Sequence, residues 1–196
     1  MMSRKEFLQN YWSYYLMLER KFLATVSFVK IATENFNTFS DEYASLLQTI
    51  GAEMDSFFKV YCNFKGNDKN KNIANYATFV LNDYPDIKKQ EIEVFDTDIV
   101  ISPFKNWNRS EAKQSLSWWV AFDNMKHNRV DSQKGASLEN VLNMLGALFL
   151  LEMKYLSKIS AENNEPDIPN KESELFSLKC WEFKHVSARN INLKLV

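Results

Sequence analysis

Residues Ser137 to Leu156 read SLENVLNMLGALFLLEMKYL, the most apolar stretch of this 196-residue chain. Ser137 is a favoured helix cap, because its hydroxyl can accept a hydrogen bond from a backbone N–H of the first turn. From Val141 to Met153 the apolar residues leave almost no polar face. A helix that is apolar on all sides needs other elements around it. The stretch therefore predicts the central helix of a helical bundle.

Four more helical patterns precede this helix. Apolar residues recur every three or four positions over residues 3–31 and again over residues 40–64. These two long helices are expected to pair as an antiparallel hairpin. A shorter helix is expected over residues 72–81. Another should begin after a cap at Ser110 and end within residues 127–130.

Two segments alternate between apolar and polar residues, which is typical of strands. The first is residues 92–101, and the second is the C-terminal tail, which follows a polar loop expected over residues 160–174. The alternating apolar residues of the tail are Phe176, Leu178, Cys180, Ile191, Leu193 and Leu195. We expect the tail to pair with residues 92–101 in a small sheet.

These patterns predict a mainly α fold: an up-and-down helical bundle of about five helices with a small accessory β element near residues 92–101 and the C-terminus. A chain of 196 residues is long enough for one core and short for two, so residues 1–196 are expected to form a single domain. Within it, residues 1–158 should form the bundle core. Residues 159–196 should add a loop and an extended C-terminal segment.

The composition narrows the class of function. With 24 basic and 25 acidic residues the net charge is −1, so binding to nucleic acid would have to be local. Cys62 and Cys180 lack CxxC spacing, which favours buried free thiols in a reducing cytosol. The N-terminus has no secretion signal pattern, and the apolar run over residues 144–151 is far shorter than a membrane span. A cytoplasmic protein with no membrane contact is expected.

Chemically useful side chains gather in one run, Trp118 to Arg129. On a helix that ends near residue 130, Asp123 and His127 lie one turn apart, so the carboxylate can hold one ring nitrogen and leave the other free. Asn124 is expected on the same face, and Lys126 and Arg129 flank it as cations for anionic oxygens. A histidine beside two cations suits metal-independent cleavage of RNA.

A structural explanation of the same run stays open. Lys, His and Arg are favoured at a helix C-terminus, because they interact well with the helix dipole and the last carbonyls. One ring of the Trp118–Trp119 pair is expected in the core and the other at an edge. Base stacking is the less favoured alternative, because a stacking platform normally comes with a basic groove. The second histidine, His185, is a surface residue or a helper of the first. The chain contains no HExxH, CxxC, nucleophile-elbow or phosphate-loop pattern, so no metal or cofactor is expected.

From about Ser3 to Leu156 the chain resembles the HEPN superfamily of small prokaryotic helical-bundle proteins. The resemblance rests on the long helical hairpin, the helix ending in Asn124-Met-Lys-His-Asn-Arg129 and the apolar helix that follows. It implies a metal-independent endoribonuclease that acts as a homodimer, often in toxin or anti-phage systems, with the two catalytic signatures facing each other. That signature is an Arg, an adjacent polar residue and a His four to six positions after the Arg.

This chain departs from that signature. Ala121, Phe122 and Asp123 occupy the positions where the Arg is expected, so only His127 carries over directly. Asn124 can stand in for the polar residue, and Lys126 or Arg129 can supply the cation from the other side. Two hypotheses follow: a dimeric ribonuclease in which His127 is the acid/base, and a non-catalytic, antitoxin-like module that binds itself or a partner protein.

Overall fold

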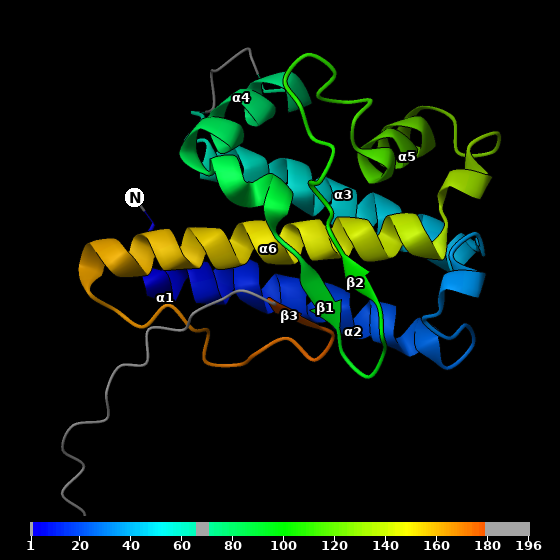
Figure 1. Ribbon diagram of the computed structural model, residues 1–196, viewed down its shortest axis with the longest axis horizontal. Helices are drawn as coiled ribbons and strands as arrows, with labels where there is room; N and C mark the ends of the chain where they lie inside the picture. Colours follow the sequence, from blue (N-terminus) through cyan, green and yellow to red (C-terminus); the bar gives the residue numbers. More distant parts are fainter. Residues whose placement is uncertain (1, 66–70, 179–196) are drawn as a thin grey trace, which may run out of the picture.

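The computed structural model describes residues 2–65 and 71–178 and is mainly helical, as the sequence predicts (Figure 1). A three-stranded antiparallel sheet covers one side. The expected mainly α bundle with a small β element is therefore confirmed. No helix in these two ranges is long and apolar enough to cross a membrane.

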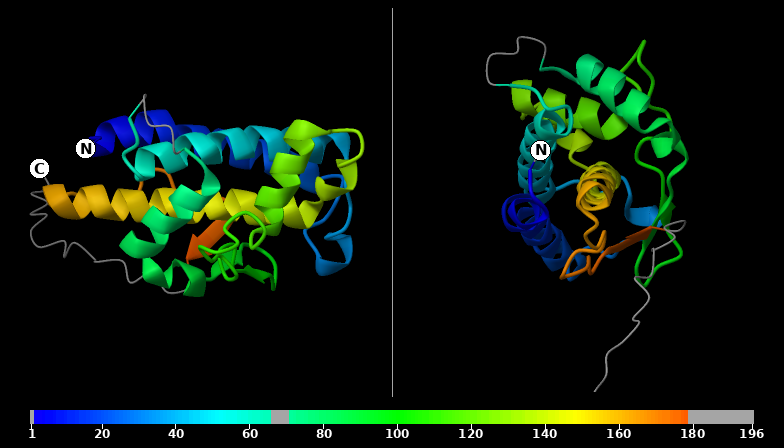
Figure 2. Two further views of the ribbon diagram at one scale, coloured as in Figure 1. Left: turned by 90° about the horizontal axis from the view of Figure 1, so that it is seen from above. Right: turned by 90° about the vertical axis from the view of Figure 1, so that its left-hand side faces the viewer.

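The apolar stretch forms α6 (Leu138–Asn163), which is the central helix. Figure 2 shows it end-on, with α1 and α2, α3 and the green segments around it. Ser137 caps it by accepting a hydrogen bond from the Asn140 N–H at 3.3 Å. The helix continues past the predicted end at Leu156 and stops where Asn164 takes the left-handed conformation, with φ of 54°. The loop expected from residue 160 thus starts later.

The N-terminal hairpin is present, but its first helix is shorter than predicted. It consists of α1 (Arg4–Phe7), a π-helical turn η1 (Leu8–Trp12) and α2 (Ser13–Val26). It ends at Val26 rather than residue 31. Near this end the Thr25 hydroxyl donates a hydrogen bond to the Phe22 carbonyl at 2.7 Å. Such a side-chain hydrogen bond to the backbone competes with continuation of the helix. After η2 (Thr33–Asn35), the second helix of the hairpin is α3 (Asp41–Tyr61), which packs against α6.

The remaining helices are α4 (Ile73–Asp83), η3 (Pro85–Lys89), α5 (Ser117–His127) and η4 (Gln133–Gly135). The prediction that Ser110 caps α5 was wrong. The Asn108 side chain accepts hydrogen bonds from the Ser110 hydroxyl and the Glu111 N–H, both at 2.8 Å. This side-chain turn keeps the chain out of a helix until Ser117.

The sheet consists of β1 (Ile92–Val94), β2 (Val100–Ile101) and β3 (Phe176–Leu178) in the order β2-β1-β3. In β1 the two apolar residues are buried and Glu93 is exposed, as alternation requires. Glu93 pairs with Val100 on one side and Ser177 on the other. The expected pairing of residues 92–101 with the C-terminal segment is confirmed for β3. The predicted strand residues from Cys180 onward lie outside the described residues.

Candidate functional site

Helix α5 lies directly on α3 through its buried face. That face consists of Trp118, Trp119, Ala121, Phe122 and Met125. The approach is close at Gly51 of α3, where a Cβ atom would come within 2.2–2.5 Å of the Phe122 ring. Because the apolar side of α5 is fixed in this way, its polar side chains are left at the surface. These include four of the five site residues predicted from the sequence, namely Asp123, Asn124, Lys126 and His127.

Asp123 lies between Lys113 and His127. Its Oδ2 accepts a hydrogen bond from the Lys113 ammonium at 2.5 Å, and its Oδ1 lies 3.6 Å from Nε2 of His127. The Asp123 side chain is 26% exposed, whereas that of His127 is 72% exposed. The structure therefore brings Asp123 and His127 together. The separation of 3.6 Å is an ion-pair distance for a protonated histidine and is too long for a hydrogen bond.

Lys113 was missed by the sequence analysis, although it holds Asp123. On one continuous helix from Ser110, residues 113 and 123 would lie about 15 Å apart along the axis. The turns before Ser117 instead bring Lys113 back beside the start of α5. The Asn108-Arg-Ser110 sequence is a turn signal that could have found this change of direction.

A groove of about 550 Å³ runs beside this triad. Three segments line it: Gln48, Ala52 and Asp55 of α3, residues 71–73 before and at the start of α4, and Lys113, Trp119, Phe122, Asp123 and Lys126. Asp123 and Lys126 are thus sequence-predicted residues that line the groove. The lining also carries two apolar rings, so the groove joins charged and apolar surface.

The remaining predicted residues lie outside the groove lining. Asn124 and His127 are exposed, with His127 next to the lining residue Lys126. Arg129 lies beyond the helix end, where its Nη1 is 3.8 Å from the Asp41 carboxylate. Both side chains of that pair are mostly exposed, so the contact is weak. The cluster predicted from the sequence is therefore divided between the groove and the surface around it.

The charges in the groove leave a surplus of positive charge. Asp55 accepts a hydrogen bond from the Tyr76 hydroxyl at 3.0 Å and pairs with Lys59. Asp123 is compensated by Lys113. Lys126 has no ion pair within the described ranges 2–65 and 71–178. Lys126 is therefore free to bind an anion, since no carboxylate in the described ranges neutralises its charge.

The two tryptophans mainly build the core. Trp118 is 1% exposed and donates its indole N–H to the Pro103 carbonyl at 2.9 Å, so it cannot present a ring to a ligand. Trp119 is 7% exposed, and the part that remains accessible lines the groove. Trp118 is thus the core ring of the pair, and Trp119, although also buried, is the ring that reaches an edge.

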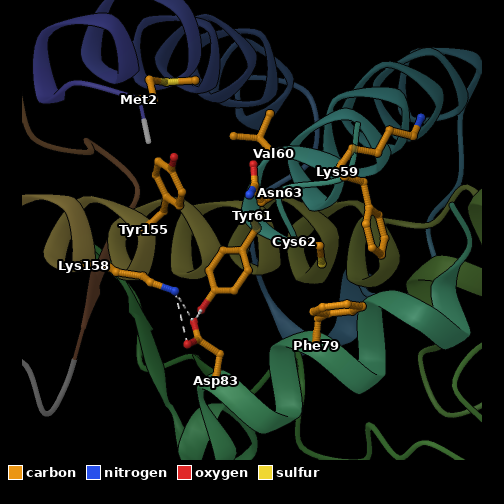
Figure 3. A pocket seen from close by; sticks show the side chains of 11 residues that line it. Met2, Lys59, Val60, Tyr61, Cys62, Asn63, Phe79, Asp83, Tyr155 and Lys158 are labelled. Atoms are coloured by element: carbon orange, nitrogen blue, oxygen red, sulfur yellow. Dashed lines mark hydrogen bonds and ion pairs between the residues drawn. The ribbon is translucent and has the colours of Figure 1, made fainter. Parts of the chain in front are cut away.

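A second cavity, of about 710 Å³, lies between the end of α3, α4 and α6 (Figure 3). Here the Asp83 carboxylate accepts hydrogen bonds from the Tyr61 hydroxyl at 3.0 Å and from Lys158 at 3.0 and 3.2 Å. Burial raises the pKa of the Cys62 thiol to about 12, so the thiol stays protonated at neutral pH and is a poor nucleophile. The polar groups of this cavity mainly satisfy one another.

Within residues 2–65 and 71–178, no group of three or more His, Cys, Asp or Glu side chains could hold a metal ion. His185, the other histidine of the sequence, lies outside those ranges.

No family model, curated protein sequence or solved structure matches this chain.

Proposed function

We propose that this chain is a HEPN-like protein that binds RNA beside α5 and cleaves it without a metal ion. One observation carries the proposal. Asp123 is held by Lys113 and lies 3.6 Å from His127, at a groove in which Lys126 is unpaired within the described ranges. The site thus combines an imidazole, a carboxylate beside it and a cation for a phosphate oxygen.

The chemistry follows from these three groups. His127 takes the proton of a ribose 2′-OH, and the 2′-oxygen attacks the adjacent phosphorus while the bond to the 5′-oxygen breaks. The leaving 5′-oxygen takes a proton from a second acid, and the products are a cyclic phosphate and a 5′-OH end, so the step consumes no water. Asp123 stabilises the imidazolium that forms, and Lys126 stabilises the charge on the phosphate oxygens. Arg129 adds a second cation once a phosphate replaces its weak contact with Asp41.

The proposal includes a homodimer. The reaction needs a base for the 2′-OH and an acid for the leaving oxygen, and one chain provides one histidine next to this groove in the described ranges. A second copy of His127 across a two-fold axis would supply the other group, in agreement with the HEPN resemblance. Action within a toxin or anti-phage defence system is the biological setting that the resemblance suggests.

A second candidate is a non-catalytic module that binds itself or a partner protein. The long Asp123–His127 separation favours it, because Asp123 does not fix the ring by a hydrogen bond. The absence of an Arg at positions 121–123 points the same way. This candidate predicts no RNA cleavage, together with a complex that weakens when an exposed aromatic residue such as Phe28 is replaced by Ser.

An RNA-cleavage assay in EDTA separates the two candidates. We expect the unmodified chain to cut single-stranded RNA and the His127→Ala variant to lose at least about 100-fold in rate. His185→Ala, which removes the other histidine of the chain, is the matched control and should keep its activity. Undiminished cutting by His127→Ala, or no cutting by the unmodified chain, would overturn the ribonuclease assignment.

A further inference from the structure

We infer that the groove beside α5 is a nucleobase pocket in which Gln48 selects the base of a single-stranded RNA. The inference rests on the proposed RNA function and extends it from the phosphate to the base. It concerns α3, which the HEPN-like signature residues do not include.

The size and the walls of the groove suit a planar ring. Its volume of about 550 Å³ lies within the range of small-ligand pockets and exceeds that of a nucleobase. Trp119 and Phe122 form an apolar wall from α5, and Ile73 adds an aliphatic side chain from the start of α4. Both aromatic rings are packed into the core, so this wall is rigid. A rigid apolar wall can support a base without first being ordered itself.

Gln48 is the polar group of the groove best placed to read a base. Its side chain is half-buried, and its amide makes no hydrogen bond within residues 2–65 and 71–178. An amide carries both a donor and an acceptor, which is the pairing pattern of a Watson–Crick edge. Asn72, the other amide in the lining, already uses its Oδ1 to cap α4 through the Ala74 and Asn75 N–H groups, each at 3.1 Å.

The charges fix the orientation of the ligand. Asp55 is compensated by Lys59 and Tyr76, so the α3 wall that carries Gln48 presents little net charge to a neutral base. Lys126 and the neighbouring His127 mark the other side, where a phosphate is stabilised. A base enclosed between Gln48 and the aromatic wall cannot also be paired in a duplex, which is why the ligand must be single-stranded.

Binding by fluorescence anisotropy tests this inference without requiring catalysis. The full chain carrying His127→Ala is titrated with labelled pentanucleotides of U, C, A or G and with an abasic strand of the same length. We expect the tightest homopolymer to bind at least about fivefold better than the abasic strand. Adding Gln48→Leu should remove most of the preference among the four bases. Adding Gln48→Glu, which loses the donor, should change which base is preferred.

Gln114→Leu is the matched control, because Gln114 is an exposed glutamine that does not line this groove. It should leave all five affinities unchanged. If the abasic strand binds as tightly as every homopolymer, or if both Gln48 variants keep the original preference, the base pocket is wrong while phosphate binding stands. If no strand binds, both the base pocket and the proposed RNA function fail.

Discussion

At the scale of single residues, the site depends on how Asp123 divides its two oxygens. One oxygen is held by Lys113 at 2.5 Å and the other faces His127 at 3.6 Å. The sequence predicts the second relation from one-turn spacing. The contact with Lys113 depends on turns before Ser117, which the helical pattern of the sequence does not reveal. Asp123 therefore has a fixed position even though it lies near the surface.

We predict that Asp123→Asn lowers the rate of RNA cleavage by about tenfold or more, because the imidazolium formed by His127 loses its negative partner. The measurement is the single-turnover rate in EDTA. Asp131→Asn is the control, because it makes the same chemical change just beyond the helix. The Asp131 carboxylate there accepts a hydrogen bond from the Asn128 side chain and not from His127. Equal rates for the two variants would contradict the role given to Asp123.

Glu152 is the residue that least fits its surroundings. It lies on the central helix and is fully buried, and neither carboxylate oxygen has a hydrogen-bond partner among residues 2–65 and 71–178. Burial, with a further contribution from Glu53, raises its pKa well above the usual value of 4.5. Tyr11 and Tyr15 also interact electrostatically with it, and a phenol carries no positive charge that could favour the carboxylate.

We predict that Glu152→Gln stabilises the protein by about 1 kcal/mol or more at pH 8. In the folded state Glu152 keeps its proton above pH 4.5, whereas in the unfolded chain Glu152 loses its proton near that pH. The folded state therefore binds more protons, and the free energy of unfolding falls as the pH rises above 4.5. The amide of the Glu152→Gln variant does not titrate, so the variant does not lose stability in this way. Thermal unfolding at pH 5 and pH 8 should therefore give a gap between variant and unmodified chain that widens with pH. A gap that is the same at both values would contradict a raised pKa.

At the scale of elements, the predictable features are those with a local cause. The helix α6 follows from an uninterrupted apolar pattern and a serine cap, and both are in the structure. The start of α5 could not be predicted in this way. The apolar pattern of the helix extends to residues before Ser117, but a turn closed by the Asn108 side chain keeps those residues out of the helix. The groove also needs α3, and no pattern within a single helix predicts which residues of α3 will face α5.

The packing of α5 on α3 gives a prediction of its own. Gly51→Ala should destabilise the protein by about 1–3 kcal/mol and weaken RNA binding, since the added methyl group meets the Phe122 ring that lines the groove. Chemical denaturation and anisotropy measure the two effects. Gly135→Ala is the control, because its Cβ would lie at an ordinary 3.5 Å from Ala121. A Gly51→Ala protein as stable as the control would contradict the close approach.

At the scale of the whole molecule, the C-terminal segment is fastened to the N-terminal helix by a buried carboxylate. Glu19 of α2 accepts hydrogen bonds from the Tyr15 hydroxyl at 2.7 Å, the Glu174 N–H at 2.8 Å and the Ser173 hydroxyl. This contact joins the two ends of the described chain and precedes β3 directly. Nothing in the pattern of the isolated segments predicts it, because the partners lie more than 150 positions apart.

We predict that Glu19→Ala costs about 2–4 kcal/mol and releases β3, because several hydrogen bonds to a buried charged group are lost together. Hydrogen exchange at the Phe95 amide, which bonds the Leu175 carbonyl at 2.9 Å, reports the release. Glu162→Ala removes an exposed carboxylate and serves as the control. Unchanged protection of the Phe95 amide in Glu19→Ala would show that the sheet docks without this contact.

The proposed homodimer is tested by sedimentation equilibrium. The expected mass is twice the 23.0 kDa of one chain at the concentrations used for RNA cleavage. Because the second His127 is needed, the rate per chain should also rise with protein concentration until the dimer is saturated. A monomer that cleaves RNA at a concentration-independent rate would refute the shared site.

The most direct test of the account is to locate RNA on the protein. Backbone amide shifts of the His127→Ala chain are followed by NMR while a single-stranded oligonucleotide is added. We expect the largest changes to cluster around Gln48, Lys113 and residues 119–126, which surround the groove beside α5. Changes centred instead on the cavity of Tyr61, Asp83 and Lys158, or no changes at all, would contradict it.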